Sequence, residues 1–123
     1  EILENRLASA RLCHSMYGSK NHELVVILKG AGTVIVNGSN QIMINTSGNP
    51  GMATGGMGDV LSGVIGAMMC QGLNPDTASG AAVYLHGMAG DVLYEEFGHG
   101  FNATELADMI PSTIRKLLTS TGE

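Results

Sequence analysis

The spacing of apolar residues changes several times along the chain, and each change predicts a different element. Residues 1–17 place apolar side chains at helical intervals with no capping residue ahead of Glu1, so we expect a helix that is already under way and an N-terminal portion that is missing. Residues 24–28 form an uninterrupted apolar run rich in β-branched residues, which is typical of a buried parallel strand. The small-residue loop 29–33 follows, and ligands gather at such carboxyl ends of strands in open α/β sheets.

A hairpin and a glycine-rich loop are predicted next. Residues 34–36 and 41–44 flank Asn37-Gly38, a common turn signal, so we expect an antiparallel hairpin with a loop longer than two residues. Residues 45–58 are dense in Gly, Asn, Pro, Ser and Thr. An apolar run begins at about Asp59 and predicts a buried helix.

Two more helices complete the pattern. Asn74-Pro75-Asp76 starts a helix whose apolar spacing continues to Glu96, before Gly98-His99-Gly100 breaks it. Asn102 or Thr104 then caps a last helix with one apolar side. The order of these elements predicts an α/β protein.

Composition and charge exclude several classes of partner. At 123 residues and 12.7 kDa the chain has room for one small domain. Six basic against eleven acidic residues give a net charge of −5, and Lys and Arg form no cluster, so we expect no nucleic-acid partner. No apolar run is long enough to span a bilayer, and we expect no membrane partner. Cys13 and Cys70 are isolated thiols, which favours a reduced, cytoplasmic location.

The strongest chemical signal is Gly55-Gly56-Met57-Gly58-Asp59, a glycine loop that runs directly into the apolar helix. Backbone amides at a helix start are donors for an anion, so residues 55–58 are a candidate anion hole for a transferred phosphoryl group. Asp59 could orient or deprotonate a substrate hydroxyl beside it, and Lys29 is a candidate to offset the repulsion between the two anions. The alternative is a tight turn in which Asp59 merely caps the helix.

Other motifs fit less well. Met57 follows Gly56 where a P-loop needs lysine, and Gly30-Ala31-Gly32 lacks the third glycine of the dinucleotide-binding fingerprint. The histidines have no metal-ligand spacing: His14, His22, His86 and His99. We predict no metal-ligating residue among them. His86 and Asp91 lie on a predicted helix, where structural roles are the better interpretation.

Two separated motifs resemble the C-terminal domain of the YjeF family, the ADP- or ATP-dependent NAD(P)H-hydrate dehydratases of the ribokinase-like superfamily. Residues 29–35 resemble the nucleotide loop of that family, and residues 49–63 resemble its long signature around the GGxGD anion hole. Residues 84–91 are similar to the helix that usually follows. The likeness extends from about Val25 to Leu118.

This resemblance implies a three-layer α/β/α sandwich, with residues 1–123 as the C-terminal portion of one ribokinase-like catalytic domain. It also implies a lyase that restores NADH or NADPH from the hydrated form, with the hydroxyl phosphorylated by ADP or ATP and then eliminated, and with Mg²⁺ as cofactor. The nucleotide would be contacted by Lys29, Gly30, Ala31, Gly32, Thr33 and Gly58. The anion hole would consist of Gly55, Gly56, Met57 and Gly58. Asp59 would contact the hydrated nicotinamide and act as the base.

The expected partners are hydrated NADH or NADPH, ADP or ATP, the missing N-terminal part of the same domain, and further copies of the chain in a homo-oligomer. Two alternatives stay open. A small-molecule kinase of the same superfamily would use Gly58 and Asp59 alike. A half-domain without catalytic activity would only bind nucleotide or a partner chain.

Overall fold

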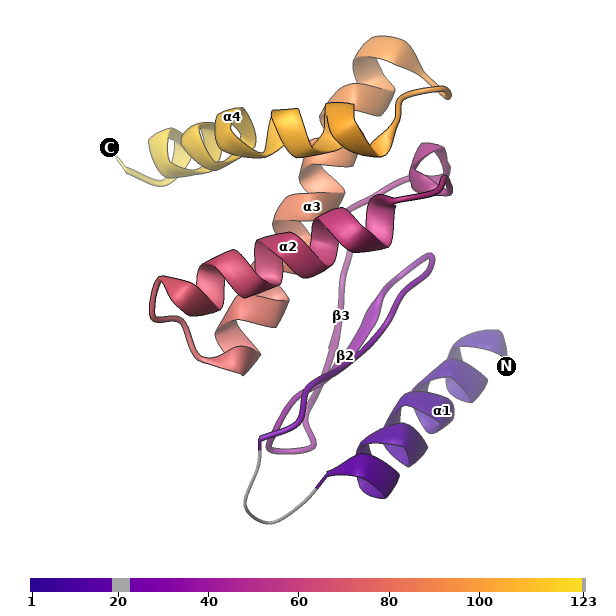
Figure 1. Cartoon of the computed structure of the whole chain (residues 1–123). Helices are drawn as coiled ribbons and strands as arrows, with labels where there is room; N and C mark the ends of the chain where they lie inside the picture. The colour runs from indigo at the N-terminus through magenta and orange to yellow at the C-terminus, as the bar shows by residue number, and fades with distance from the viewer. Residues whose placement is uncertain (19–22, 123) are drawn as a thin grey trace.

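A small three-stranded sheet lies between one N-terminal helix and a group of three later helices (Figure 1). The computed structural model describes residues 1–18 and 23–122, so the expectation for His22 lies outside the described residues. The elements, in chain order, are α1 (Ile2–Tyr17), β1 (Val26–Leu28), β2 (Val34–Val36), β3 (Ile42–Ile44), the 3₁₀ turn η1 (Pro50–Met52), α2 (Met57–Cys70), α3 (Pro75–Phe97) and α4 (Ala103–Gly122).

Every strand pairing in the described sheet is antiparallel. The order is β1-β2-β3, with Ile27 opposite Ile35 and Ile35 opposite Met43. The predicted hairpin is therefore confirmed, whereas the prediction of a parallel pairing is wrong for β1 in the described part of the chain. The cause is the short loop 29–33, because so few residues can return the chain only to an antiparallel neighbour.

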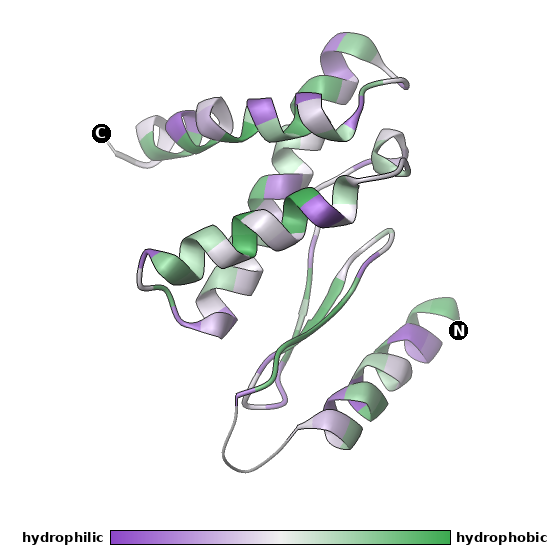
Figure 2. Cartoon of the chain, viewed as in Figure 1, coloured by the Kyte–Doolittle hydropathy of each residue, from purple (hydrophilic) through white to green (hydrophobic). Residues whose placement is uncertain are grey.

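The sheet is covered on both faces, which gives three layers. Val34 and Val36 of β2 pack with Ala10 of α1 on one face. Ile35, whose side chain points to the opposite face, packs with Leu61 of α2 and with residues of α3. All of β2 is buried, and Figure 2 shows the strands as an apolar stretch between the helices. The α/β/α arrangement agrees with the predicted fold class.

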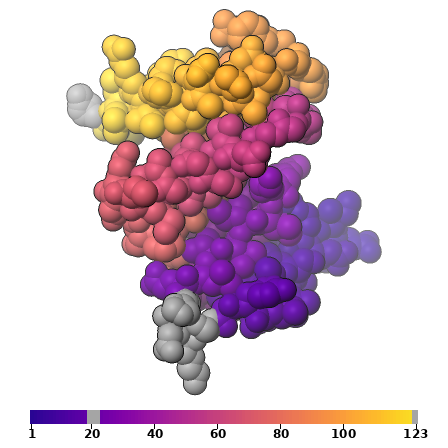
Figure 3. All heavy atoms as spheres, viewed as in Figure 1, coloured from indigo at the N-terminus to yellow at the C-terminus, as the bar shows by residue number. Residues whose placement is uncertain are grey.

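A second core joins the three later helices. Met57 at the start of α2 packs with Leu93 of α3 and Leu106 of α4. Asn102 caps α4, because its Oδ1 accepts from the Glu105 amide at 2.9 Å while the Glu105 carboxylate accepts from the Asn102 amide at 2.8 Å. Of the two predicted caps, Asn102 is the one the structure uses. Figure 3 shows α4 stacked directly on α2, with the hairpin on the other side of α2.

The ends of α2 and α3 follow from glycine and asparagine. Helix α2 begins at Met57, two positions before the expected start, because Gly56 adopts φ 90° and turns the chain into the helix. Asn74 caps α3 through a 2.9 Å bond from the Thr77 amide, and Gly98, at φ 65°, ends it as predicted. Among the described helices, none combines the length and the apolar content that crossing a bilayer requires.

Candidate active site

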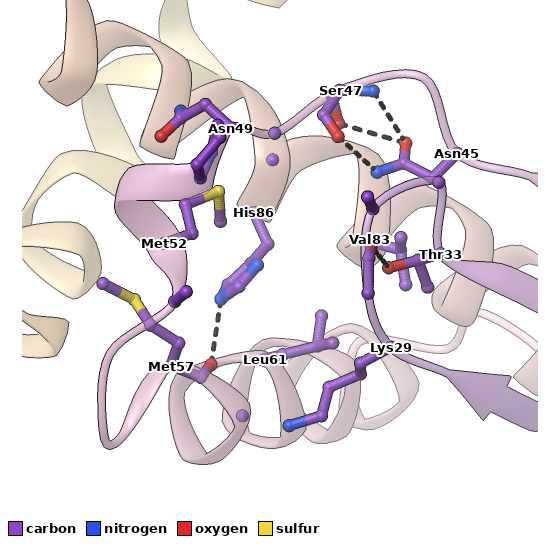
Figure 4. Close-up of a pocket in the computed structure, with 18 of the residues that line it drawn as sticks. Lys29, Thr33, Asn45, Ser47, Asn49, Met52, Met57, Leu61, Val83 and His86 are labelled. Atoms are coloured by element: carbon purple, nitrogen blue, oxygen red, sulfur yellow. Dashed lines mark hydrogen bonds between the residues drawn. The ribbon is translucent and has the colours of Figure 1, made fainter.

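A cavity of about 770 Å³ lies where the loop after β1 meets the start of α2 (Figure 4). Its wall consists of residues 29–33, 45–50 and 52–55, together with Met57, Gly58, Leu61, Val83, His86 and Gly87. The loop 29–33 and the glycine loop that begins at Gly55 are thus brought to one cavity, although they are more than twenty positions apart in the sequence. The volume is in the range of small-molecule and cofactor sites.

Lys29 reaches the first turn of α2. Figure 4 shows its side chain extending from the end of β1 toward that helix, and its ammonium lies directly against the Cα of Gly58. Any larger residue at position 58 would occupy the space that the ammonium uses. Glycine at this position therefore lets a positive charge lie beside the helix start, as the predicted role of Lys29 requires.

The loop after β1 is held from outside by Arg6, a residue that sequence reasoning missed. The Arg6 guanidinium donates to the carbonyls of Ala31 at 2.6 Å, Gly32 at 3.1 Å and Leu28 at 3.1 Å. Gly32 adopts φ 66°, which favours glycine. Arg6 therefore fixes a loop whose carbonyls point toward α1. One basic residue in a helix has no local pattern that would have revealed this contact.

The amides of the glycine loop are free to bind an anion. Within the described residues, the amides of positions 55–58 donate to no acceptor, whereas those of Asp59 and Val60 both donate to the Gly56 carbonyl at 3.1 Å. Gly56 itself offers no side chain to cap α2. The unpaired amides and the positive end of the helix dipole therefore lie together at the start of α2.

Asp59 is exposed on the first turn of α2, and its carboxylate accepts no hydrogen bond from the described residues. The cap position belongs to Gly56, so the alternative in which Asp59 caps its own helix is not the observed arrangement. Gly56 and Asp59 do not line the cavity among the described residues, while Gly55, Met57 and Gly58 do. The role of Asp59 as the base stays a prediction.

The back of the cavity is held by α3. Asp91 accepts from the Gly48 amide at 3.0 Å and from the Asn49 side-chain amide at 2.8 Å, which anchors the loop ahead of the glycines. His86 is buried, and its Nε2 lies 2.9 Å from the Met57 carbonyl oxygen. Burial lowers the pKa of His86 from its usual 6.5, the bond to Met57 opposes this shift, and the Lys29 ammonium lowers the pKa further.

Within the described residues, no group of three or more His, Cys, Asp or Glu side chains is placed to hold a metal ion. Lys29 and the backbone amides at the start of α2 are donors that can bind an anion, and polar side chains such as Thr33, Asn45 and Ser47 also line the cavity.

The α/β/α arrangement, with a glycine loop at a helix start and a lysine beside it, matches a ribokinase-like fold. A ribokinase-like superfamily protein from Enterococcus faecalis superposes with a TM-score of 0.75 and 33% identity, over 89% of this chain and 36% of that chain. A family model described as NAD(P)H-hydrate dehydratase matches residues 3–112. The chain belongs to this family, as the two sequence motifs predicted.

Individual relatives agree with this assignment. The bifunctional NAD(P)H-hydrate repair enzyme Nnr of Escherichia coli is 42% identical over 97% of this chain and 22% of the relative. The ADP-dependent (S)-NAD(P)H-hydrate dehydratase of Neisseria meningitidis is 38% identical over 87% and 35%. The ADP/ATP-dependent NAD(P)H-hydrate dehydratase of Bacillus subtilis, co-crystallized with ATP/Mg²⁺, superposes with a TM-score of 0.83 and 32% identity, over 94% of this chain and 40% of that chain. The chain thus spans between about a fifth and two fifths of these relatives.

Proposed function

We propose that this chain contributes the nucleotide and anion site of a domain that restores NADH or NADPH from the hydrated form, using ADP or ATP. The observation that carries the proposal is the placement of the Lys29 ammonium against Gly58 at the start of α2, where the amides of residues 55–58 donate to no acceptor among the described residues. The relatives supply the substrate class, because their names specify NAD(P)H-hydrate, and two of them specify ADP or ATP.

In this proposal each site residue has a role that its position supports. Residues 29–33 border the nucleotide, and the amides of residues 55–58 bind the phosphoryl group that is transferred. Asp59 takes the proton from the hydroxyl of the hydrated nicotinamide while that oxygen bonds to the terminal phosphorus of the nucleotide, and the bond from this phosphorus to the rest of the nucleotide breaks, which releases AMP from ADP or ADP from ATP. The phosphorylated oxygen then leaves as phosphate, the adjacent ring carbon loses a proton to water, and the carbon–carbon double bond of the reduced ring is restored.

Magnesium fits this site as an ion carried by the nucleotide. Mg²⁺ usually keeps several waters and is held by substrate phosphates with one or two carboxylates. The described lining of the cavity holds no Asp or Glu, so the ion would depend on the phosphates of the nucleotide and on water. When bound, the ion would neutralise charge on the phosphates.

The remaining predictions about the protein as a whole belong to the same proposal. We propose that residues 1–123 form the C-terminal portion of one ribokinase-like domain and that the rest of this domain completes the substrate pocket, because each relative is longer than the matched region. The complete protein is this chain together with that remainder. A homo-oligomeric state and a cytoplasmic location are proposed with it, and size-exclusion chromatography with light scattering tests the first.

The test is an assay of the complete protein with NADH hydrate and either ADP or ATP, followed by the absorbance of the NADH that forms. We expect recovery of NADH only when nucleotide is present. Phosphate transfer to a small alcohol without NADH recovery would favour the kinase alternative. Nucleotide binding without turnover of either kind would favour the half-domain that only binds.

A further inference from the structure

One face of α3 forms the support of the cavity. His86, Gly87, Gly90 and Asp91 share this face, since residues at such spacings lie side by side on a helix. A Cβ built on Gly87 would lie 2.8 Å from the carbonyl carbon of Ser47, and one on Gly90 would lie 2.7 Å from Cγ of Met52. The loop ahead of the glycines is therefore pressed against α3 without spare room.

His86 extends this support to the first turn of α2. The Met57 carbonyl can only accept a hydrogen bond, so the hydrogen of the 2.9 Å bond belongs to Nε2 of His86 (Figure 4). Because burial favours the neutral ring, Nε2 carries its single N–H, and that N–H is committed to Met57. With 8% of its surface exposed, the ring has little freedom to turn away.

The bond to Met57 helps to hold the direction of a neighbouring donor, in addition to the helical geometry of α2. The carbonyl of Met57 and the amide of Gly58 belong to one planar peptide group, in which C=O and N–H point in opposite directions. Holding the carbonyl therefore orients the Gly58 N–H out of the open N-terminal end of α2. Gly58 is also the residue against which the Lys29 ammonium lies.

We propose that His86 is a positioning residue of the nucleotide site, which orients the Met57–Gly58 peptide so that the Gly58 amide binds a phosphate of ADP or ATP. The choice of ligand rests on the proposed function, whereas the contact with Met57 is independent of it. His86 acts on the nucleotide through the peptide and need not touch the nucleotide itself.

Two substitutions separate this role from a direct one. His86→Gln keeps an N–H donor that can reach the Met57 carbonyl, whereas His86→Leu removes the donor. His86→Asn is shorter and also loses the bond, and it carries the test if His86→Leu fails to fold. His14→Leu is the matched control, because Nε2 of His14 also bonds a backbone carbonyl, that of Leu24 at 3.0 Å, away from the cavity.

The measurement is calorimetry of ADP and ATP binding to the complete protein, together with hydrogen exchange over residues 55–61. We expect His86→Leu or His86→Asn to weaken nucleotide binding roughly tenfold, as the loss of one well-placed hydrogen bond would. His86→Gln should stay within about threefold of the wild type, and His14→Leu should bind as the wild type does. Exchange in the first turn of α2 should be faster in His86→Leu than in His86→Gln.

Three results would overturn the inference. Unchanged affinity in His86→Leu would show that the bond to Met57 does not govern binding. An equal loss in His86→Gln and His86→Leu would assign His86 a direct contact through Nδ1. If the complete protein binds no nucleotide, unchanged exchange in the first turn of α2 would refute the positioning role. Nucleotide binding without NADH recovery would instead contradict the proposed function alone.

Discussion

Gly58→Ala should separate the stability of α2 from the function of its N-terminus. Gly58 is the second residue of the helix and is absent from the glycines with positive φ, so an alanine fits the backbone. Its Cβ, however, would collide with Nζ of Lys29 and lie 3.4 Å from Cε. The ammonium must move away from the helix start.

Gly58→Ala should have opposite effects on the stability of the protein and on its affinity for nucleotide. The ammonium is the end of a flexible side chain, so its displacement costs the fold little, and replacing glycine by alanine in a helix stabilises by up to about 1 kcal/mol. We therefore expect a change in the free energy of unfolding between zero and about +1 kcal/mol. In the complex, a charged hydrogen bond to phosphate is lost, which is worth about 1.5–3 kcal/mol, or roughly 10- to 150-fold in affinity.

The assay compares urea unfolding with calorimetry of ADP binding, both on the complete protein. Gly66→Ala is the matched control, because Gly66 lies in the same helix and a Cβ there meets nothing within 4 Å. The control should gain stability and bind nucleotide normally. If Gly58→Ala binds as tightly as Gly66→Ala, Lys29 does not contact the nucleotide from this position. If Gly58→Ala loses stability by more than about 1 kcal/mol, the lysine contact supports the fold instead.

Three further predictions follow from the site. Asp59→Asn should lower turnover at least about a hundredfold with an unchanged urea midpoint, since an amide cannot take the proton; near-normal turnover would remove Asp59 as the base. Asp91→Asn should destabilise the protein by about 1–3 kcal/mol in urea unfolding, because its new NH₂ group would face a donor, the Gly48 amide or the side chain of Asn49; a smaller change would mean that the loop holds without this anchor. His86 has a lowered pKa in the folded state, so the unfolded chain binds more protons as the pH falls through about 6.5, and stability should decrease there. His86→Gln should remove that part of the slope of unfolding free energy against pH, and an identical slope would contradict it.

Apolar spacing and turn chemistry were enough to predict most of the elements. The helical spacing of residues 1–17, the asparagine before Pro75 and the hairpin around Asn37-Gly38 all act over a few positions, and the structure agrees with each. The prediction of a buried parallel strand at residues 24–28 was wrong in two respects in the described part of the chain: β1 is only partly buried, and its partner β2 is antiparallel. An apolar, β-branched run predicts a strand but does not specify its direction. Direction depends on the length of the following loop, 29–33, which the periodicity of the strand does not contain.

The site was predictable only where its residues form a local motif. The glycine loop and the Lys29 loop each have a recognisable sequence, and residues 29–33, Gly55, Met57 and Gly58 line the cavity. Arg6 contacts the loop after β1, and His86 contacts Met57. Each contact links residues that are more than twenty positions apart in the sequence. A lone arginine on a helix, or a histidine among small residues, has the same local appearance whether or not such a contact exists. Only the fold distinguishes these cases.

The electrostatics of the helix start give an independent reason to regard the cavity as a ligand site. A helix N-terminus favours an anion by about 0.3–1 kcal/mol, and it disfavours a cation for the same reason. Here the Lys29 ammonium lies against the first turn of α2, although the net charge of the chain is −5 and acidic residues outnumber basic ones. The Lys29 ammonium and the positive end of the helix dipole repel one another, and the Asp59 carboxylate on the same turn offsets part of this repulsion. A phosphate beside both would be attracted by each of them, so the arrangement favours an anion at this helix start.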